Sequence, residues 1–451
     1  MPEFDLVVLG AGTAGLPCAR LAGTRGKRVL LLDDGALAGT CLNTGCTPTK
    51  ALVHAVDLYR CCFNAAEYGT HFSDLHLESS EVFEYARRVV ADGLRENEER
   101  LAKIPSVTWV KKRGTFVNEE EVQAGGEMYS APNFLVATGA RPFVPPIEGL
   151  DQTPFLTHAD LIGLERHPSS LAIVGGGFIS AEYATIFHAL GTKVSVFEVA
   201  PRLVPAADEA ISQALAEHFH REGVGVHLKT AVEKVELGGG EEEGGAIHLR
   251  ASGVELDVEK LVVAAGFVGN TSELGLDAAK VKVDRRGYVK VDATLRTTNY
   301  RVWAIGDVVG HAQFTHMALR EARVVVRNMF DDAGLAVSFD DVPYAVFTLP
   351  PVASVGKTEA QLREAGVDYQ VAQTEFGRCS RGVIERPGGG TMVKLLHNGV
   401  KILGFHAFGP NADVLVGEVL PLVRLPNGME VLRELVHPHP TWLELFNNLT
   451  A

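Results

Sequence analysis

Two cysteines, Cys41 and Cys46, stand five positions apart in the tract AGTCLNTGCTPTK, which covers positions 38–50. Thiols at this spacing can form a redox disulfide, supply half of a zinc site, or be unrelated core residues. A structural zinc site usually carries a second ligand pair at similar spacing, and the sequence contains none. The tract therefore favours a redox-active dithiol with no metal.

The residues after Cys46 predict the start of a helix. Thr47 suits the N-cap, and Pro48 suits the first helical position, where a missing N–H is tolerated. Cys46 would then lie beside the positive end of the helix dipole, and Lys50 adds a positive charge one turn further on. Both features favour the thiolate form of a cysteine.

The whole tract resembles the active-site disulfide of the pyridine nucleotide-disulfide oxidoreductases, the flavoprotein family of dihydrolipoamide dehydrogenase, glutathione reductase and mercuric reductase. The usual family form is close to GGTCLNVGCIPSK, and this chain keeps the spacing with substitutions at Ala38, Thr44, Thr47 and Thr49. The resemblance implies that Cys41 exchanges with the substrate. It also implies that Cys46 makes a charge-transfer contact with the flavin.

Length and composition restrict the class of protein. A chain of 451 residues with 46% hydrophobic and 22% charged residues is long enough for about three globular domains. A net charge of −14 argues against nucleic acid as a partner, because such binding needs Lys and Arg to neutralise phosphates. Neither a membrane-spanning apolar run nor a leader is recognisable, so we expect a cytoplasmic protein without a membrane partner. In that compartment the other cysteines are expected to be free thiols, namely Cys18, Cys61, Cys62 and Cys379.

The elements that would position the dithiol begin with a nucleotide-binding turn. An apolar strand at 4–9 leads into Gly10, Gly12 and Gly15, followed by a helix, a second strand at 28–32 and Asp33. The first glycine permits a tight turn, the second lets the backbone approach a pyrophosphate, and the third lets helix and strand pack closely. Asp33 stands where an acceptor for ribose hydroxyls is expected.

A second copy of this turn follows a strand at 170–174. It has Gly175 and Gly177, with Ser180 in place of the third glycine, and a strand at 193–197 ends in Glu198. Two fingerprints predict two dinucleotides. The carboxylate of Glu198 favours NAD over NADP because it would repel a 2′-phosphate, although Arg202 leaves NADP(H) as the second choice.

Further segments between and after the turns resemble motifs of the same family. The sequence ATGARP at 137–142 looks like the point where the chain leaves the flavin domain, a strand ending at Gly266 would return it, and Gly306-Asp307 looks like the second flavin motif. The segment Gly266-Phe267-Val268-Gly269-Asn270 departs from the family, which has an arginine after the glycine, and Leu349 replaces a usual acidic residue. Positions 237–245, rich in Gly and Glu, predict a solvated hairpin loop.

The C-terminal sequence HPHPTWLE at 437–444 supplies a candidate proton relay. It matches the family order H-P-T-x-x-E, with His439 as the base and Glu444 as its partner. An imidazole with an ordinary pKa near 6.5 can give a proton to a departing thiolate and take it back at neutral pH. The alternatives for this segment alone are a surface His-Pro run and metal binding by His437 and His439.

The resemblance covers the whole chain and implies an α/β fold with two Rossmann-like domains and a C-terminal α+β dimerisation domain. The expected domains are a split FAD-binding domain at 1–148 and 266–335, an NAD(P)-binding domain at 149–265 and a dimerisation domain at 336–451.

The resemblance also implies a homodimer, in which His439 acts on the partner's disulfide. Lys50 would pair with Glu182 beside the flavin. Phe178 takes the place of a side chain that often gates the nicotinamide pocket.

The expected FAD-binding residues are Gly10, Gly12, Gly15, Asp33, Thr40, Lys50, Thr138, Gly139, Gly306 and Asp307. The expected NAD-binding residues are Gly175, Gly177, Phe178, Ile179, Glu182, Glu198 and Gly266.

The favoured function is an FAD-dependent NAD(P)H:disulfide oxidoreductase most like dihydrolipoamide dehydrogenase, acting on a small or protein-bound disulfide or dithiol. The segment at 204–208 and Glu198 favour this member over glutathione reductase. A mercuric-type reductase usually has vicinal cysteines at its C-terminus, whereas the pair Cys61-Cys62 is internal. The remaining alternatives are a copper or quinone reductase, a reductase of a low-molecular-weight disulfide, and a non-enzymatic redox sensor or flavoprotein subunit.

Overall fold

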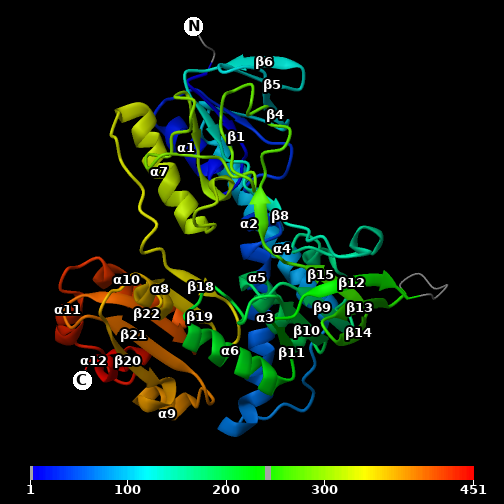
Figure 1. Cartoon of the computed structure of the whole chain (residues 1–451), viewed down its shortest axis with the longest axis vertical. Helices are drawn as coiled ribbons and strands as arrows, with labels where there is room; N and C mark the ends of the chain where they lie inside the picture. Colours follow the sequence, from blue (N-terminus) through cyan, green and yellow to red (C-terminus); the bar gives the residue numbers. More distant parts are fainter. Residues whose placement is uncertain (1–3, 239–244, 451) are drawn as a thin grey trace. The chain divides into compact units, whose positions relative to one another are not determined.

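The computed structural model describes residues 4–238 and 245–450, and the chain divides into two compact units. The first unit takes the chain up to Ala51, together with Glu84–Phe143 and Gly266–Phe339. The second takes Leu52–Phe83, Val144–Ala265 and the chain from Asp340 onward. Figure 1 labels the helices and strands of both units.

The first unit is built on a parallel sheet in the order β17-β7-β1-β2-β3. Its strands are β1 (Leu6–Leu9), β2 (Val29–Leu32), β3 (Val107–Val110), β7 (Phe134–Val136) and β17 (Val302–Ala304). The central strands are buried along their whole length, which is typical of a parallel sheet covered on both faces. Helices α1 (Gly15–Thr24) and α7 (Thr315–Asp331) pack on each other in this unit.

Smaller elements complete the first unit. An antiparallel sheet contains β4 (Gly114–Phe116), β5 (Glu121–Ala124) and β6 (Glu127–Ser130), and β8 (Ala140–Pro142) pairs with β16 (Phe267–Gly269). The short helix α2 (Gly39–Asn43) leads into α3 (Cys46–Asn64). Helices α3 and α4 (Ser79–Ala102) each continue from one unit into the other.

The second unit contains another parallel sheet, in the order β11-β10-β9-β15. Its strands are β9 (Ser170–Val174), β10 (Lys193–Glu198), β11 (Gly225–Leu228) and β15 (Lys260–Val263). Helix α5 (Phe178–Ala189) follows β9, and α6 (Glu209–Glu222) follows β10. An antiparallel sheet is formed by β12 (Val232–Leu237), β13 (Ile247–Ala251) and β14 (Val254–Val258). Strands β12 and β13 flank the predicted hairpin loop, whose positions 239–244 lie outside the described residues.

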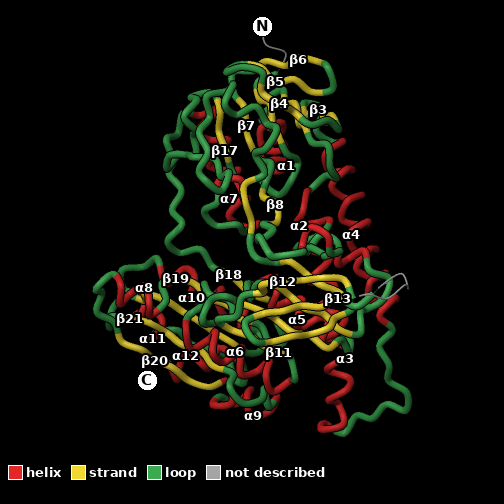
Figure 2. The backbone as a smooth tube through the Cα atoms, turned by 45° about the vertical axis from the view of Figure 1, so that its right-hand side comes forward, coloured by secondary structure: helices red, strands yellow, loops and turns green. Residues whose placement is uncertain are grey.

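A five-stranded antiparallel sheet, in the order β18-β19-β22-β21-β20, forms the C-terminal part of this unit. Its strands are β18 (Tyr344–Val346), β19 (Val352–Gly356), β20 (Gln370–Glu375), β21 (Met392–His397) and β22 (Ile402–Phe408). Figure 2 shows this sheet with α10 (Ala412–Val423) and α12 (Leu445–Thr450) beside it. The other helices here are α8 (Glu359–Glu364), α9 (Ser380–Glu385) and α11 (Gly428–Glu434). The chain also has short 3₁₀ helices: η1 (Ala65–Tyr68), η2 (Leu150–Gln152), η3 (Leu161–Gly163), η4 (Gly306–Val309), η5 (Phe376–Arg378) and η6 (Trp442–Glu444).

The predicted α/β class with two Rossmann-like sheets is confirmed, because both parallel sheets carry a strand–turn–helix unit at the expected glycines. The division into domains at 148, 265 and 335 stays a prediction. Across residues 4–238 and 245–450, no helix has the length and apolar character needed to cross a membrane.

Candidate active site

The first glycine turn joins β1 to α1 and has little room for side chains. Gly10 has a φ of +106°, and a Cβ there would lie 2.3 Å from the carbonyl oxygen of Ala137. A Cβ at Gly15 would lie 1.9 Å from the carbonyl oxygen of Gly10. Both positions therefore require glycine for the turn to form, as the sequence predicts.

Asp33 at the end of β2 is held by backbone donors. The N–H of Ala11 donates to Oδ2 of Asp33 at 2.5 Å, and the N–H of Gly35 donates to Oδ1 at 2.7 Å. The carboxylate is thereby fixed beside the glycine turn, where a ribose hydroxyl would donate to it.

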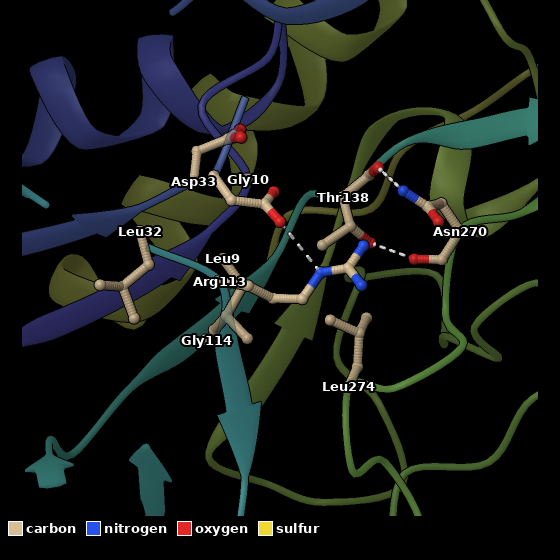
Figure 3. Close-up of a pocket in the computed structure, with 10 residues that line it drawn as sticks. Leu9, Gly10, Leu32, Asp33, Arg113, Gly114, Thr138, Asn270 and Leu274 are labelled. Carbon is tan, nitrogen blue, oxygen red and sulfur yellow. Dashed lines mark hydrogen bonds and ion pairs between the residues drawn. The ribbon is translucent and has the colours of Figure 1, made fainter. Parts of the chain in front are cut away.

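A small open pocket of about 60 Å³ lies beside Asp33 (Figure 3). Arg113 extends into the pocket, where its Nε lies 3.5 Å from Oδ2 of Asp34 and its Nη1 donates to Glu273 at 2.5 Å. Arg113 was not predicted as a site residue, because it belongs to no motif. The turn, the fixed carboxylate and this pocket fit the adenosine end of an elongated dinucleotide such as FAD. The pocket is lined by Leu9, Gly10, Leu32, Asp33, Asp34, Arg113, Gly114, Thr138, Asn270 and Leu274.

The second glycine turn repeats the arrangement of the first. Gly175 has a φ of +105°, and a Cβ there would lie 2.4 Å from the carbonyl oxygen of Ala264. Glu198 at the end of β10 accepts from the N–H of Gly176 at 2.5 Å, just as Asp33 accepts from the corresponding residue of the first turn. In both turns donor and acceptor are 22 positions apart. The two turns are therefore built alike, which fits two dinucleotide sites.

Ser180, which replaces the third glycine of the second turn, is completely buried. Its hydroxyl has no hydrogen-bond partner within the part of the chain that the structure describes. The second turn thus accommodates a side chain at the position where the first turn has Gly15, which has no room for a Cβ.

The two predicted flavin motifs come from distant parts of the chain. The Thr138 hydroxyl donates to the carbonyl of Asn270 at 2.8 Å, and the N–H of Asn270 donates to the carbonyl of Gly139 at 3.0 Å. At the start of η4, burial raises the pKa of Asp307 to about 6.

Glu321 on α7 is a buried carboxyl that the sequence analysis missed. Its Oε2 accepts from the N–H of Gly306 at 2.6 Å, and the residue is 1% exposed. Burial is the main cause that raises its pKa to about 7, and the nearby charge of Asp307 adds to the effect. The sequence contains one signal that could have identified Glu321: it is an ionisable residue on the apolar face of an amphipathic helix.

The dithiol lies on two consecutive helices of the first unit. Cys41 is on α2 and half-buried, whereas Cys46 is the first residue of α3 and exposed. The expectation that Thr47 caps this helix is wrong, because the helix already begins at Cys46; Pro48 still falls in the first turn.

The two thiols lie within hydrogen-bond reach of each other. The pKa of the Cys41 thiol is raised, first by its hydrogen bond with Cys46 and then by burial, while the positive charge of Lys50 acts in the opposite direction. The contact between the two thiols fits the predicted redox dithiol.

Thr315, the first residue of α7, contacts both sulfurs and was also missed. Its hydroxyl donates to Sγ of Cys41 at 3.2 Å and lies 3.8 Å from Sγ of Cys46. This hydrogen bond lowers the pKa of Cys41, whereas the hydrogen bond with Cys46 and burial, which are the larger effects, raise it. The contact joins positions 274 residues apart, so local sequence patterns contain no trace of it.

His439 and Glu444 form the predicted pair in the second unit. Nδ1 of His439 lies 2.7 Å from Oε1 of Glu444, and the imidazole is 68% exposed while the carboxylate is 17% exposed. The hydrogen bond with His439 is the main cause that lowers the pKa of Glu444. The second oxygen of Glu444 accepts from the N–H of Thr441, which fixes the carboxylate and therefore the ring.

His437 has contacts of its own, to Oδ1 of Asn447 at 3.0 Å and to Glu418 at 3.6 Å. Among the residues with described positions, no group of three or more His, Cys, Asp or Glu side chains is arranged to hold a metal ion.

The remaining predicted residues lie in both units. In the first, Thr40 is on α2, and the carbonyl of Gly266 accepts from the N–H of Phe143 at 2.9 Å. In the second, Ile179 and Glu182 are on α5, where Glu182 is 6% exposed. Lys50 and Glu182 belong to different units, as do Cys41 and His439, so both pairings stay predictions. The Phe267 carbonyl of the unusual segment accepts from Arg286 and from the Tyr288 hydroxyl.

Comparisons with known proteins agree with this geometry. Residues 4–322 match the model of the pyridine nucleotide-disulphide oxidoreductases, and residues 342–450 match the dimerisation domain of the same proteins. The chain belongs to this family. It is therefore an FAD-dependent oxidoreductase that uses a nicotinamide dinucleotide, and the second match supports a homodimer.

Individual relatives have different names. The chain is 30% identical over 449 residues to a dihydrolipoyl dehydrogenase of Chlamydia muridarum, a match that covers 98% of this chain and 95% of that protein. It is 29% identical over 446 residues to a mercuric reductase of Bacillus cereus, with coverage of 98% and 70%. Among solved structures, the Cu(II) complex of the HOCl-induced flavoprotein disulfide reductase RclA from Escherichia coli has a TM-score of 0.88 at 29% identity, covering 98% and 99% of the two chains. These family members share the flavoprotein oxidoreductase framework but have different substrates in their names.

Proposed function

We propose that this protein is an NADH-dependent disulfide reductase whose redox centre is the dithiol of Cys41 and Cys46. The observation that carries the proposal is the contact of the two thiols with each other and with the Thr315 hydroxyl. Bound FAD would accept a hydride from the nicotinamide and supply two electrons to this sulfur pair. Cys41, the thiol that the family resemblance assigns to substrate exchange, would then attack the substrate disulfide.

The sulfur step balances as a thiol–disulfide exchange. The Cys41 thiolate forms a bond to one substrate sulfur, and the substrate S–S bond breaks to release a thiolate. Cys46 then attacks Cys41 of this mixed disulfide, which releases the second substrate thiol and leaves the Cys41–Cys46 disulfide. Two electrons have passed from the protein dithiol to the substrate.

His439 would provide the proton for the departing substrate thiolate. The hydrogen bond between its Nδ1 and Glu444 supports this role, because it leaves Nε2 as the atom that exchanges the proton. The carboxylate stabilises the cationic ring between the two proton transfers. Since the imidazole is 68% exposed within its own chain, it is accessible to a disulfide of a partner subunit.

NADH is the proposed nucleotide because of Glu198. This carboxylate lies at the end of β10, held by the N–H groups of Gly176 and Ala200 at 2.5 and 2.7 Å. A negative charge in a fixed position accepts ribose hydroxyls and repels a 2′-phosphate.

For the substrate, we favour a lipoyl-type or other small disulfide over a metal ion. The match to a dihydrolipoyl dehydrogenase over nearly its whole length supports this choice. Reduction of Hg²⁺ or Cu²⁺ is the second candidate, supported by the similarity to mercuric reductase and to RclA, whose solved complex contains Cu(II).

The deciding experiment is a steady-state panel with NADH or NADPH against lipoamide, glutathione disulfide, Hg²⁺, Cu²⁺ and quinones. We expect NADH with a disulfide to give the highest kcat/KM. The Cys41→Ser variant should lose disulfide turnover and retain a long-wavelength flavin band from the Cys46 thiolate, whereas the control Cys61→Ser should keep normal turnover. Normal disulfide turnover by Cys41→Ser would contradict the proposal, and turnover with metal ions alone would favour the second candidate.

A further inference from the structure

A strand of the C-terminal sheet lies against the helix that follows the second glycine turn. Strand β18 packs on α5, whose first residue, Phe178, comes directly after Gly177. Strand β18 falls within the match to the dimerisation domain, whereas α5 falls within the match to the nucleotide-binding part. The nucleotide helix is thus contacted by a segment from outside its own Rossmann-like sheet.

The first contact between these elements is a stacked pair of aromatic rings. The centroids of Phe178 and Tyr344 are 4.9 Å apart, with an angle of 27° between the ring planes. Stacking of this kind adds attraction beyond the burial of apolar area. The ring of Phe178, at the N-terminus of α5, is thereby held against the ring of Tyr344.

The second contact lies one helical turn further along α5. The N–H of Phe347 donates to Oε1 of Glu182 at 3.0 Å. Positions 178 and 182 lie on the same face of the helix, because side chains four residues apart are neighbours. The segment 344–347 therefore holds two functional positions of α5 at once.

Tyr344 is itself anchored on its other side. Its hydroxyl lies 3.4 Å from the carbonyl of Ala206 and also bonds Ser354 of the neighbouring strand β19. Burial raises the pKa of this hydroxyl to about 12, so it stays a neutral donor at working pH. The ring that supports Phe178 is therefore fixed at its hydroxyl end.

We propose that Tyr344 is a positioning residue for the dinucleotide: it fixes the Phe178 ring at the helix terminus where the pyrophosphate and the attached pyridine nucleoside bind. The inference rests on the proposed use of α5 as the NAD(H) site. A side chain whose orientation is fixed before the ligand arrives loses less conformational freedom on binding, and so binding is tighter. The C-terminal sheet thus contributes to nucleotide affinity as well as to dimerisation.

The test is the dissociation constant of NAD⁺, measured by isothermal titration calorimetry on the oxidised holoenzyme. Tyr344→Leu should weaken binding about two- to tenfold, the range expected for loss of one aromatic pair. Tyr344→Phe keeps the stacked ring and loses only the hydroxyl anchor, so it should weaken binding less than Tyr344→Leu does. The control Tyr300→Leu changes an exposed tyrosine of the first unit and should leave binding unchanged. NADH turnover should show a higher KM with kcat retained in Tyr344→Leu.

Two further variants keep the test decisive. If Tyr344→Leu fails to fold, Tyr344→Met takes its place in the test. It supplies a flexible apolar side chain without the aromatic ring and should weaken binding to the same extent. In a double-mutant cycle, Phe178→Leu combined with Tyr344→Leu should bind no more weakly than the weaker single variant, because the two rings act as one unit. Unchanged or tighter NAD⁺ binding in folded Tyr344→Leu, or fully additive losses in the cycle, would overturn the proposal. Because NAD⁺ binding to oxidised protein does not involve dithiol turnover, this failure is distinguishable from a failure of the Cys41 assignment.

Discussion

Replacement of Glu321 by glutamine should stabilise the protein at alkaline pH and leave it unchanged at acidic pH. Burial raises the pKa of Glu321 from its ordinary value of 4.5 to about 7. The native chain therefore retains a proton that the unfolded chain has already released, so the free energy of unfolding falls as pH rises through this interval. The contribution is complete below pH 4.5 and lost above about pH 7.

The size of the effect follows from the same shift. A change from 4.5 to about 7, at 1.36 kcal/mol per unit, corresponds to about 3 kcal/mol of penalty for the ionised carboxylate. Glutamine is neutral at every pH, and its side-chain oxygen can still accept the N–H of Gly306, the bond that Glu321 makes at 2.6 Å. Glu321→Gln should thus match the parent protein at pH 4.5 and exceed its unfolding free energy by up to about 3 kcal/mol at pH 8.

Urea unfolding of the holoenzyme, followed by the fluorescence of released flavin, measures this difference at a series of pH values. The control Glu99→Gln removes an exposed carboxylate of α4 and should show no pH-dependent gap. Asp307 is retained in both proteins, and because its charge adds to the pKa shift of Glu321, its coupling to Glu321 is part of the measured gap. A gap between Glu321→Gln and the parent protein that is the same at pH 4.5 and pH 8 would refute the reasoning.

Three other substitutions test the site. His439→Ala should slow the dithiol half-reaction about 10²- to 10⁴-fold, the usual magnitude for a general acid–base group, and stopped-flow mixing with disulfide would measure it; an unchanged rate removes this histidine from the mechanism. Thr315→Val deletes the donor to Cys41, worth about 1 kcal/mol, so alkylation of the reduced enzyme by iodoacetamide at fixed pH should slow about fivefold, with Thr315→Ser close to the parent protein. Equal alkylation rates in all three proteins would argue against that hydrogen bond. Ser180→Ala removes a buried hydroxyl without a hydrogen-bond partner in the described part of the chain and should raise the free energy of unfolding by about 1 kcal/mol in urea melts; a loss of stability would indicate a partner for this hydroxyl.

The parts of the fold that the sequence predicts well depend on local backbone geometry. The positions of Gly10 and Gly175 were predictable because each needs a positive φ at a fixed place between a strand and a helix. The acceptors Asp33 and Glu198 follow at a fixed distance along the chain, so their approach to the turns was also predictable.

Other contacts were beyond sequence reasoning because they join distant segments. Thr315 meets Cys41 across 274 positions, and Glu321 reaches Gly306 only because α7 packs against η4, whose first residue is Gly306. The helix start was misjudged by two residues, because a cap at Thr47 predicts Pro48 as the first helical residue, whereas the helix begins at Cys46.

The edge strand β17 has a consequence for synthesis on the ribosome. It pairs with β7, yet it lies at positions 302–304, after all the strands of the intervening parallel sheet have been translated. Strands β1, β2, β3 and β7 pair with one another and are all made earlier, so only the free edge of β7 must wait for β17. Closing so long a loop is slow, so the edge of β7 is left open to chaperones until β17 has been made.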